Sequence, residues 1–456
     1  MIFACNKSYT KCTSVCVLMV LPKISFTIAV VLNSSLTDAE IMQVSAEYMG
    51  NDLGGIPITL VYSRLLNQLR QVNGGLKPSE VYEDGGEDDT VFITEPIEKV
   101  EILHARDVEI GDIDTQLVAL DGSSRKLGSP KFKLFVASVA VYGLEPIVWH
   151  YPQPRLMERK EFLGVKQSVE NLRKIEEDEV LSQYVKVKFE NSNVFFDESA
   201  RDQHISEDVR SSLENWVVEK LANKLERGYS IILDGPLYID VQHIKYIESL
   251  TRRRIESLNK LEERGIPTLG VVKRIEVSKR LCSKDVINVL SESVGGKLNV
   301  DLGYCNDALV IQEIGKKMAY GATDVLLIGP LKQVYGKGAS KDIRSFTLPE
   351  RIFWFIYSGL GPKAIRVETL GSMYNNNKFR DTIETLVFWL AHTIEEKGIP
   401  RIINTVDRYA KYFTKRMFLT LGGIMKAMDI AFDYDTGLEF LRIASDLARG
   451  DSDEYD

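Results

Sequence analysis

Two apolar runs of the chain end in the same dipeptide, Asp-Gly, and this repetition limits the folds that the chain can adopt. The runs are residues 116–120, before Asp121-Gly122, and residues 229–233, before Asp234-Gly235. An acidic side chain next to a buried strand is unfavourable unless a cation or a hydrogen-bond donor compensates its charge. A glycine after it lets the backbone turn sharply and leaves room for a ligand. If both runs are strands of one sheet, we expect the two carboxylates to converge at neighbouring strand ends.

The pattern around these runs alternates between strands and helices. Short continuous apolar runs indicate buried strands, and apolar residues spaced three to four apart indicate helices. The strand at 229–233, the charged helix at 244–264 and the strand at 268–272 form a strand, helix, strand unit. The predicted fold is α/β, a mixed sheet flanked by helices with an N-terminal extension. The other predicted elements are strands at 132–142, 322–328 and 364–368, a strand leading into a helix at 56–71, and helices at 158–179, 206–226, 381–397 and 406–428.

The first residues form two short apolar runs, 15–21 and 24–32. Each is shorter than the roughly 20 residues that a membrane span needs. A secretory signal is the weaker alternative, because no small-residue cleavage site follows. A first strand, or a leader translated from an upstream start codon with Met42 or Met49 as the natural start, accounts for them better. We divide the chain into a leader with a mis-assigned start (1–41), an N-terminal accessory region (42–110), a main domain (111–445) and an acidic tail (446–456).

Charge and metal-binding residue types narrow the chemistry. The chain has 456 residues and a net charge of −8, so only local basic patches could hold a nucleic acid. Its five cysteines include no CxxC pair and its five histidines are dispersed, which argues against a zinc site. Carboxylates must therefore carry any metal chemistry. The cysteine usage favours a reducing cytoplasm.

Asp121 and Asp234 are the strongest candidates for that chemistry. Carboxylate oxygens suit hard cations such as Mn²⁺ or Mg²⁺. Two such ions about 4 Å apart can activate water and stabilise the leaving oxygen of a phosphodiester. The alternative is that each Asp-Gly is only a turn, because this dipeptide is a common turn signal. Two copies placed directly after buried apolar runs favour the metal site.

Four segments also carry a resemblance to a known family. They are Ala119-Leu-Asp121-Gly-Ser-Ser, Ile232-Leu-Asp234-Gly-Pro-Leu, Gly270-Val-Val-Lys273-Arg274 and Arg366-Val-Glu368. In this order and spacing, over roughly residues 115 to 430, the chain resembles the NurA family of archaeal and bacterial nucleases. The resemblance does not explain the first hundred residues.

The resemblance implies a fold, an activity and partners. The fold would be similar to ribonuclease H, with residues 111–445 as the nuclease domain. The activity would be that of a metal-dependent deoxyribonuclease, an exonuclease acting on DNA ends in end resection and repair. Its cofactor would be Mn²⁺ or Mg²⁺, as two ions. The partners would be DNA, a second copy in a homodimer, and a HerA-type hexameric ATPase.

The resemblance also implies a set of metal ligands. Asp121 and Asp234 match two metal-binding aspartates, and Glu214 is the best match for a third ligand on the preceding helix, with Glu219 and Glu207 as fallbacks. Asp407 stands where the family often has a histidine on a late helix.

Each of the weaker matches has a structural alternative. Glu214 could form a capping box with Ser211, three residues earlier, and Asp407 could cap the start of its helix. Lys273 is expected to contact a phosphate, with a solvated strand end or an ion pair as the alternative. The basic run 252–254 is interpreted as a solvated helix face.

The leading hypothesis is therefore hydrolysis of DNA phosphodiester bonds by a water molecule, with Asp121, Asp234, Glu214 and Lys273 as catalytic residues. A catalytically silent DNA-binding or scaffold subunit of the same complex is the alternative from another class. A nuclease that prefers RNA is a third possibility, since only RNA offers a 2′-hydroxyl for recognition. No nucleotide-binding loop is found in the sequence, so DNA unwinding would fall to the ATPase.

Overall fold

A computed structural model of the chain describes residues 20–21, 24–25, 56–71, 92–111, 113–143, 148–153, 155–156, 160–239, 245–321, 323–335, 348–359, 364–395 and 397–449. The segment that we assigned to the leader lies almost wholly outside these residues, and so does the acidic tail from residue 450 onward. So does the acidic run at 83–89.

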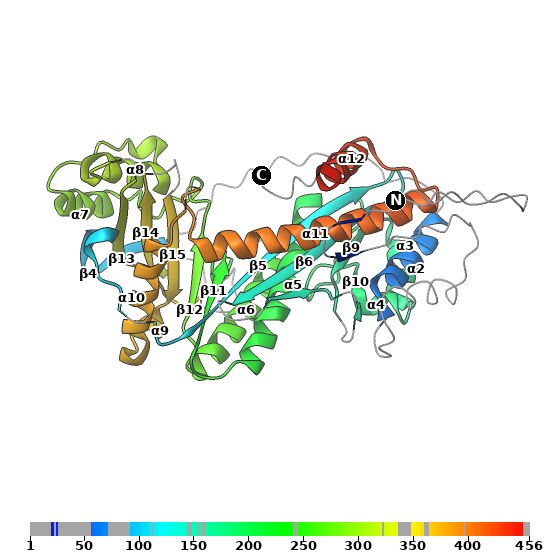
Figure 1. Ribbon diagram of the computed structural model, residues 1–456, viewed down its shortest axis with the longest axis horizontal. Coiled ribbons are helices and arrows are strands. Elements are labelled where there is room, and N and C mark those ends of the chain that lie inside the picture. Colours follow the sequence, from blue (N-terminus) through cyan, green and yellow to red (C-terminus); the bar gives the residue numbers. More distant parts are fainter. Residues whose placement is uncertain are drawn as a thin grey trace, which may run out of the picture.

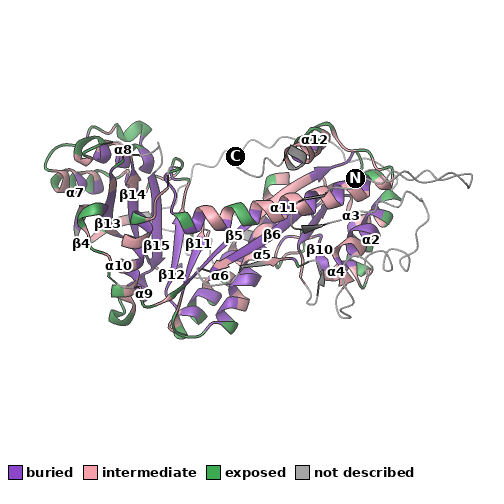
Figure 2. Ribbon diagram, in the orientation of Figure 1, coloured by how far each residue is buried: buried purple, intermediate pink, exposed green. Residues whose placement is uncertain are grey.

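One eleven-stranded sheet dominates the part of the chain that the structure describes, and most of its strands are buried (Figures 1 and 2). The strand order is β10-β9-β6-β5-β11-β12-β15-β14-β13-β4, with β7 paired to β6. The bounds are β4 Phe92–His104, β5 Gln116–Gly128, β6 Lys133–Gly143, β7 Val148–Tyr151, β9 Leu163–Lys166, β10 Val185–Lys186, β11 Tyr229–Asp234, β12 Thr268–Val272, β13 Val325–Tyr335, β14 Arg351–Ser358 and β15 Ala364–Leu370. Two small sheets pair β1 Val20–Leu21 with β2 Ile24–Ser25, and β3 Ile56–Pro57 with β8 Arg155–Leu156.

Five central strands have the ribonuclease H-like topology. Strands β5, β6 and β9 pair antiparallel in sequence order, and β11 then pairs parallel to β5, with β12 parallel to β11. Helix α5, Asp202–Lys224, precedes β11, and helix α6, Lys245–Glu263, connects β11 to β12. The α/β class and the ribonuclease H-like fold are therefore confirmed.

The other half of the sheet is antiparallel and extends this core. Strand β15 pairs with β12, followed by β14, β13 and β4. Strand β4 comes from the region that we assigned to an accessory unit, yet it forms an edge of the main sheet. Helices α7, Lys284–Val294, and α8, Asp307–Met318, lie at this end of the molecule (Figure 1).

Long helices cover the central strands on both faces. Helix α11, Arg401–Ala427, runs along β5 and β6 on one face, and α5 and α6 lie on the other (Figure 1). The α11 side chains that face the sheet, such as Val406, Ala410 and Phe418, are fully buried. The remaining helices are α2 Ile58–Arg70, η1 Ala105–Asp107, α3 Val169–Glu177, α4 Leu181–Tyr184, η2 Leu302–Tyr304, α9 Gly371–Tyr374, α10 Asn377–His392 and α12 Tyr434–Arg449.

Two expectations about local structure are wrong. The helix expected over 158–179 is preceded by strand β9, because residues 162–165 are fully buried and pair with β6. Strand β5 does not end at Asp121, because residues 122–128 continue it as a long antiparallel partner of β6. The end of β11 at Asp234 is as expected.

A disulfide joins Cys282 to Cys305 and so links the residues before α7 to those before α8. Disulfides persist mainly in oxidising compartments and in the intracellular proteins of hyperthermophiles. The reducing cytoplasm expected from the sequence therefore stays a prediction. Among the described residues, no helix is long and apolar enough to cross a membrane.

Candidate metal centre

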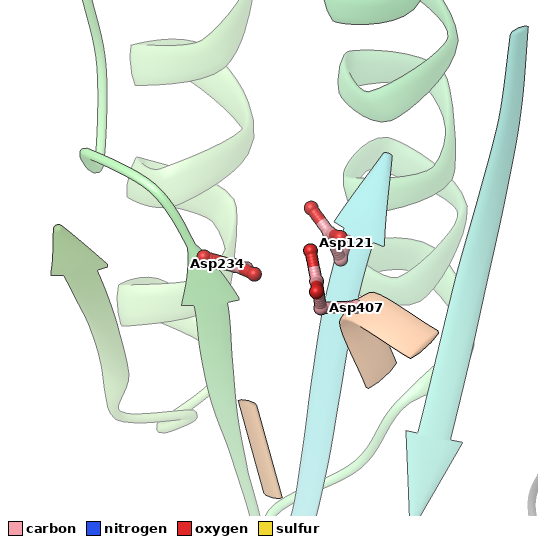
Figure 3. A group of neighbouring side chains, drawn as sticks. All are labelled: Asp121, Asp234 and Asp407. Carbon is pink, nitrogen blue, oxygen red and sulfur yellow. The ribbon is translucent and has the colours of Figure 1, made fainter. Parts of the chain in front are cut away.

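Sheet register brings the two Asp-Gly aspartates together. Leu233 of β11 is the parallel partner of Leu120 of β5, so the next residues, Asp234 and Asp121, lie side by side where the two strands part. Helix α11 crosses at this point and contributes Asp407. Oxygen atoms of the three carboxylates lie within 4.8 Å of one another (Figure 3). The convergence that we expected from the sequence is thus present, although only one of the two aspartates ends a strand.

Burial makes this carboxylate cluster electrostatically unfavourable. Asp121 is 7% exposed, and the side chain of Asp234 is 5% exposed. Burial raises the pKa of Asp121 well above its usual value, and the negative charge of Asp234 raises it further. Burial also raises the pKa of Asp234, to about 6, against the opposing effect of Lys273. Ionised carboxylates held together away from water are stabilised by an added cation.

Lys273 supplies part of that positive charge. Its ammonium nitrogen donates to Asp234 at 2.6 Å and to Asp407 at 3.2 Å. Burial would lower the pKa of Lys273, but the surrounding aspartates outweigh burial and raise it. For Asp407, burial acts to raise the pKa, but Lys273 and Lys411 outweigh it and leave the pKa below its usual value. The ion-pair alternative is therefore what the structure shows for Lys273.

Glu214 lies next to the cluster but is held by arginines. It projects from the middle of α5 toward Gly122, with Arg254 at 3.3 Å and Arg210 at 3.6 Å from its oxygens. Since α5 begins at Asp202, Glu214 is not part of a capping box at Ser211. The fallback Glu219 instead pairs with Arg253 at 3.2 Å.

At two further residues the structure differs from what the sequence suggested. Asp407 lies in the second turn of α11, which begins at Arg401, so it does not cap the helix. Arg254 is 7% exposed and binds Glu214, so the solvated-face interpretation is wrong for this member of the basic run. Arg210 was not singled out from the sequence, although its position four residues before Glu214 on a helix was a usable signal.

The donor set fits a hard divalent cation. All the converging ligands are carboxylates, which Mn²⁺ and Mg²⁺ accept, and no described histidine or cysteine joins them. The raised pKa values of Asp121 and Asp234 reflect first the burial of their charge and then repulsion from neighbouring carboxylates, and such a cation would relieve both.

The chain matches a known protein family over the residues that form this site. A family model described as the NurA domain matches residues 115–412, which is most of the chain. The chain belongs to the NurA family. The matched residues include all four acidic candidates and Lys273.

Solved structures of NurA proteins are also similar to this chain. One is the NurA nuclease from Sulfolobus solfataricus, at 12% identity and a TM-score of 0.32, covering 76% of this chain and 88% of that chain. A second NurA structure has 10% identity and a TM-score of 0.37, over 75% and 92% of the two chains. A third, NurA with manganese, has 10% identity and a TM-score of 0.31, over 81% and 97%. No match is found among curated proteins. Membership of NurA rests on the domain match.

Gly122 sets the distance between β5 and α5 in this NurA domain. A β-carbon at this position would lie 2.2 Å from an oxygen of Glu214, which two arginines hold in place. We expect Gly122→Ala to displace Glu214 and to weaken Mn²⁺ binding by about 10–100-fold, the usual effect of losing a supporting contact. Calorimetric titration measures this. Gly423→Ala is the control, because nothing lies within 4 Å of its added carbon. Equal affinities for both variants would contradict the placement of Glu214.

Metal binding to the NurA cluster should weaken in acid. The pKa of Asp234 is about 6, so protons compete with a cation below that pH. Titration with Mn²⁺ at pH 7.5 and at pH 5 should show an affinity about tenfold lower at pH 5 for this one proton. Without metal, acid has the opposite effect, on stability. The folded state binds this proton more tightly than the unfolded state, so the stability of the metal-free protein rises as the pH falls through 6. A Mn²⁺ affinity that does not change between the two pH values would contradict this.

Proposed function

We propose that the chain is a metal-dependent deoxyribonuclease that hydrolyses phosphodiester bonds from DNA ends, in end resection and repair. One observation carries the proposal: three carboxylates from β5, β11 and α11 converge at the centre of a ribonuclease H-like sheet in a chain of the NurA family.

Asp121, Asp234 and Asp407 would hold the cations, with Glu214 as a further ligand. We propose two ions, Mn²⁺ or Mg²⁺, as in other phosphodiester hydrolases with carboxylate pairs. When bound, they would lower the pKa of a water molecule and stabilise charge on the phosphate oxygens. Gly235, which follows Asp234, has a φ of +125° and no side chain, and nothing lies within 4 Å of where its β-carbon would be, so no side chain of this turn crowds Asp234. Arg210 and Arg254 keep Glu214 directed at β5.

Lys273 would have two functions in this site. Without metal it neutralises Asp234 and Asp407, and once cations take over that role its ammonium group would be available to a substrate phosphate. We expect Lys273→Met to destabilise the protein in chelator by about 1–3 kcal/mol, because two charged hydrogen bonds are lost, and Mn²⁺ to restore the stability. Denaturation by urea with and without Mn²⁺ measures both effects. Lys411→Met is the control, since within the described residues Lys411 pairs with Asp407 alone, at 3.1 Å, and is 41% exposed. Equal losses for the two variants, or no rescue by Mn²⁺, would contradict this role.

The remaining proposals concern partners, location and domains. We propose that the protein acts in the cytoplasm as a homodimer with a HerA-type hexameric ATPase, which would supply the unwinding that a chain with no nucleotide-binding loop needs. We keep the division at residues 42–110, 111–445 and 446–456 as a proposal, with the qualification that β4 belongs to the main sheet.

A silent scaffold is the second candidate, because Lys273 already neutralises two of the three aspartates and could make the cluster stable without metal. End-labelled DNA and RNA of the same sequence, incubated with Mn²⁺ or with chelator, separate the possibilities. A nuclease shortens DNA from its ends only when metal is present. A scaffold leaves both substrates intact, and preferential loss of the RNA would favour the RNA alternative.

A further inference from the structure

Helix α11 is strongly basic, although the chain as a whole is acidic. Its only acidic residue is Asp407, whereas the chain has a net charge of −8. Its six basic residues are Arg401, Arg408, Lys411, Lys415, Arg416 and Lys426. The same helix therefore brings a metal-binding candidate and a concentration of positive charge to the site.

The basic side chains lie on the face of α11 that does not pack on the sheet. The opposite face is fixed to the sheet by Ala410 and Thr414, and the Thr414 hydroxyl donates to the carbonyl of Ser123 at 3.3 Å. Helical periodicity then turns Arg408 and Lys415 outward, about two turns apart. Arg408 is exposed and forms no ion pair with any residue in the described part of the chain.

Aromatic rings lie between these cations. Tyr409 stacks on Tyr142 of β6 with ring centres 5.9 Å apart, and Phe413 stacks on His150 of β7 at 4.0 Å. Tyr409 and Phe413 are themselves nearly parallel, at 6.3 Å. Tyr409 remains 36% exposed, although it is stacked on a neighbouring ring. Cations beside a partly exposed aromatic ring are features that bind single-stranded nucleic acid without sequence preference.

We propose that single-stranded DNA leaves the carboxylate cluster along α11, with its phosphates against Arg408 and Lys415 and a base stacked on Tyr409. This inference rests on the proposed nuclease function and specifies the strand that the enzyme holds. The path begins at Asp407 and reaches Arg416 nine residues later, about 14 Å along the helix at 1.5 Å per residue.

Two considerations select this ligand. Unpaired bases expose the faces that stack on aromatic rings, whereas the bases of a duplex are stacked on one another. A second copy of the chain would bring the same basic helix against this one, and like charges across an interface are unfavourable. DNA carries the complementary charge.

The test measures binding of a labelled oligothymidylate and of a blunt duplex by fluorescence anisotropy at several salt concentrations. Chelator is present throughout, so that no cleavage occurs. Tyr409→Ala should weaken single-strand binding at least about fivefold and leave duplex binding nearly unchanged, while Tyr409→Phe should keep it. Arg408→Ala should weaken both and lower the salt dependence on the single strand by about 0.7 in logarithmic slope. Tyr304→Ala and Lys316→Ala, both at the distant α7–α8 end, are matched controls without effect.

Several results would overturn the proposal. If the Tyr409 and Arg408 variants bind DNA like the controls, this path is excluded. Mn²⁺-dependent cleavage by the native protein would in that case still support the nuclease function. An equal loss on single strand and duplex would exclude stacking on Tyr409. If the variants change the sedimentation of the protein and leave its DNA binding unchanged, this face of α11 is a contact between copies of the chain. Absence of Mn²⁺-dependent cleavage by the native protein would instead contradict the proposed function itself.

Discussion

Replacing Asp234 by asparagine is expected to lower Mn²⁺-dependent DNA cleavage by more than about a hundredfold, since losing even a group that supports a metal ligand lowers activity or affinity by 10–100-fold. The same substitution should make the metal-free protein more stable. The pKa of Asp234 is raised to about 6, so its charged form is less favourable in the folded protein than in the unfolded chain. Asparagine has the shape of the neutral form. Opposite effects on activity and stability are characteristic of a site held together for function.

A matched control separates this effect from the general loss of an aspartate. Asp202 lies at the start of α5 and pairs with Lys126, Lys133 and Lys166, away from the carboxylate cluster. We expect Asp202→Asn to be less stable than the native protein and to cleave DNA at the native rate. Cleavage rates with saturating Mn²⁺ and thermal melting in chelator supply both readings. If Asp234→Asn cleaves normally, or is the less stable of the two variants in chelator, the role given to Asp234 is wrong.

Loss of Glu368 should have the largest effect on stability. Its carboxylate accepts from Arg351 at 2.9 Å and from Arg366 at 3.0 Å, and all three side chains are at most 4% exposed. The same carboxylate accepts the backbone N–H of Leu237 at 2.8 Å, so it also holds the turn that follows Asp234. Glu368→Ala would leave two buried guanidinium groups without their counter-charge. We expect a loss of about 3–5 kcal/mol in unfolding free energy, together with weaker Mn²⁺ binding.

The neighbouring Thr369 gives the comparison for Glu368. Its buried hydroxyl donates one neutral hydrogen bond to the carbonyl of Thr268 at 3.0 Å. Thr369→Val keeps the shape and should lower stability by only about 1 kcal/mol. Denaturant titration of both variants tests the difference. Similar losses for the two would show that the buried charges are not what stabilises this part of the sheet.

The sequence was sufficient to predict that Asp121 and Asp234 converge. Asp121 and Asp234 each follow a buried apolar run, which indicated two buried strands whose carboxylates converge if both belong to one sheet, and the structure pairs these strands as the parallel neighbours β5 and β11. The sequence also predicted β12 with its bounds, Thr268–Val272, and most of α5 and α11. These elements are long or strongly apolar, so local pattern and tertiary packing agree.

The parts that the sequence did not predict depend on packing between distant segments. Residues 122–128 look polar, yet they extend β5 because β6 pairs with them along their length. Arg254 stands in a run of three arginines, and only the crossing of α6 over α5 makes it a buried partner of Glu214. The charges and aromatic rings of α11 were not singled out from the sequence, because their relation to the cluster depends on where the helix crosses the sheet.

The most direct test of the central claim is to locate manganese itself. Crystals soaked in Mn²⁺ and measured at the manganese absorption edge should show an anomalous peak about 2 Å from oxygens of both Asp121 and Asp234, the usual length for carboxylate ligands of a hard cation. Soaked crystals of Asp121→Asn should lose or weaken that peak. A protein that cleaves DNA with Mn²⁺ but shows no peak between these two carboxylates, or shows its only peak elsewhere, would contradict the account.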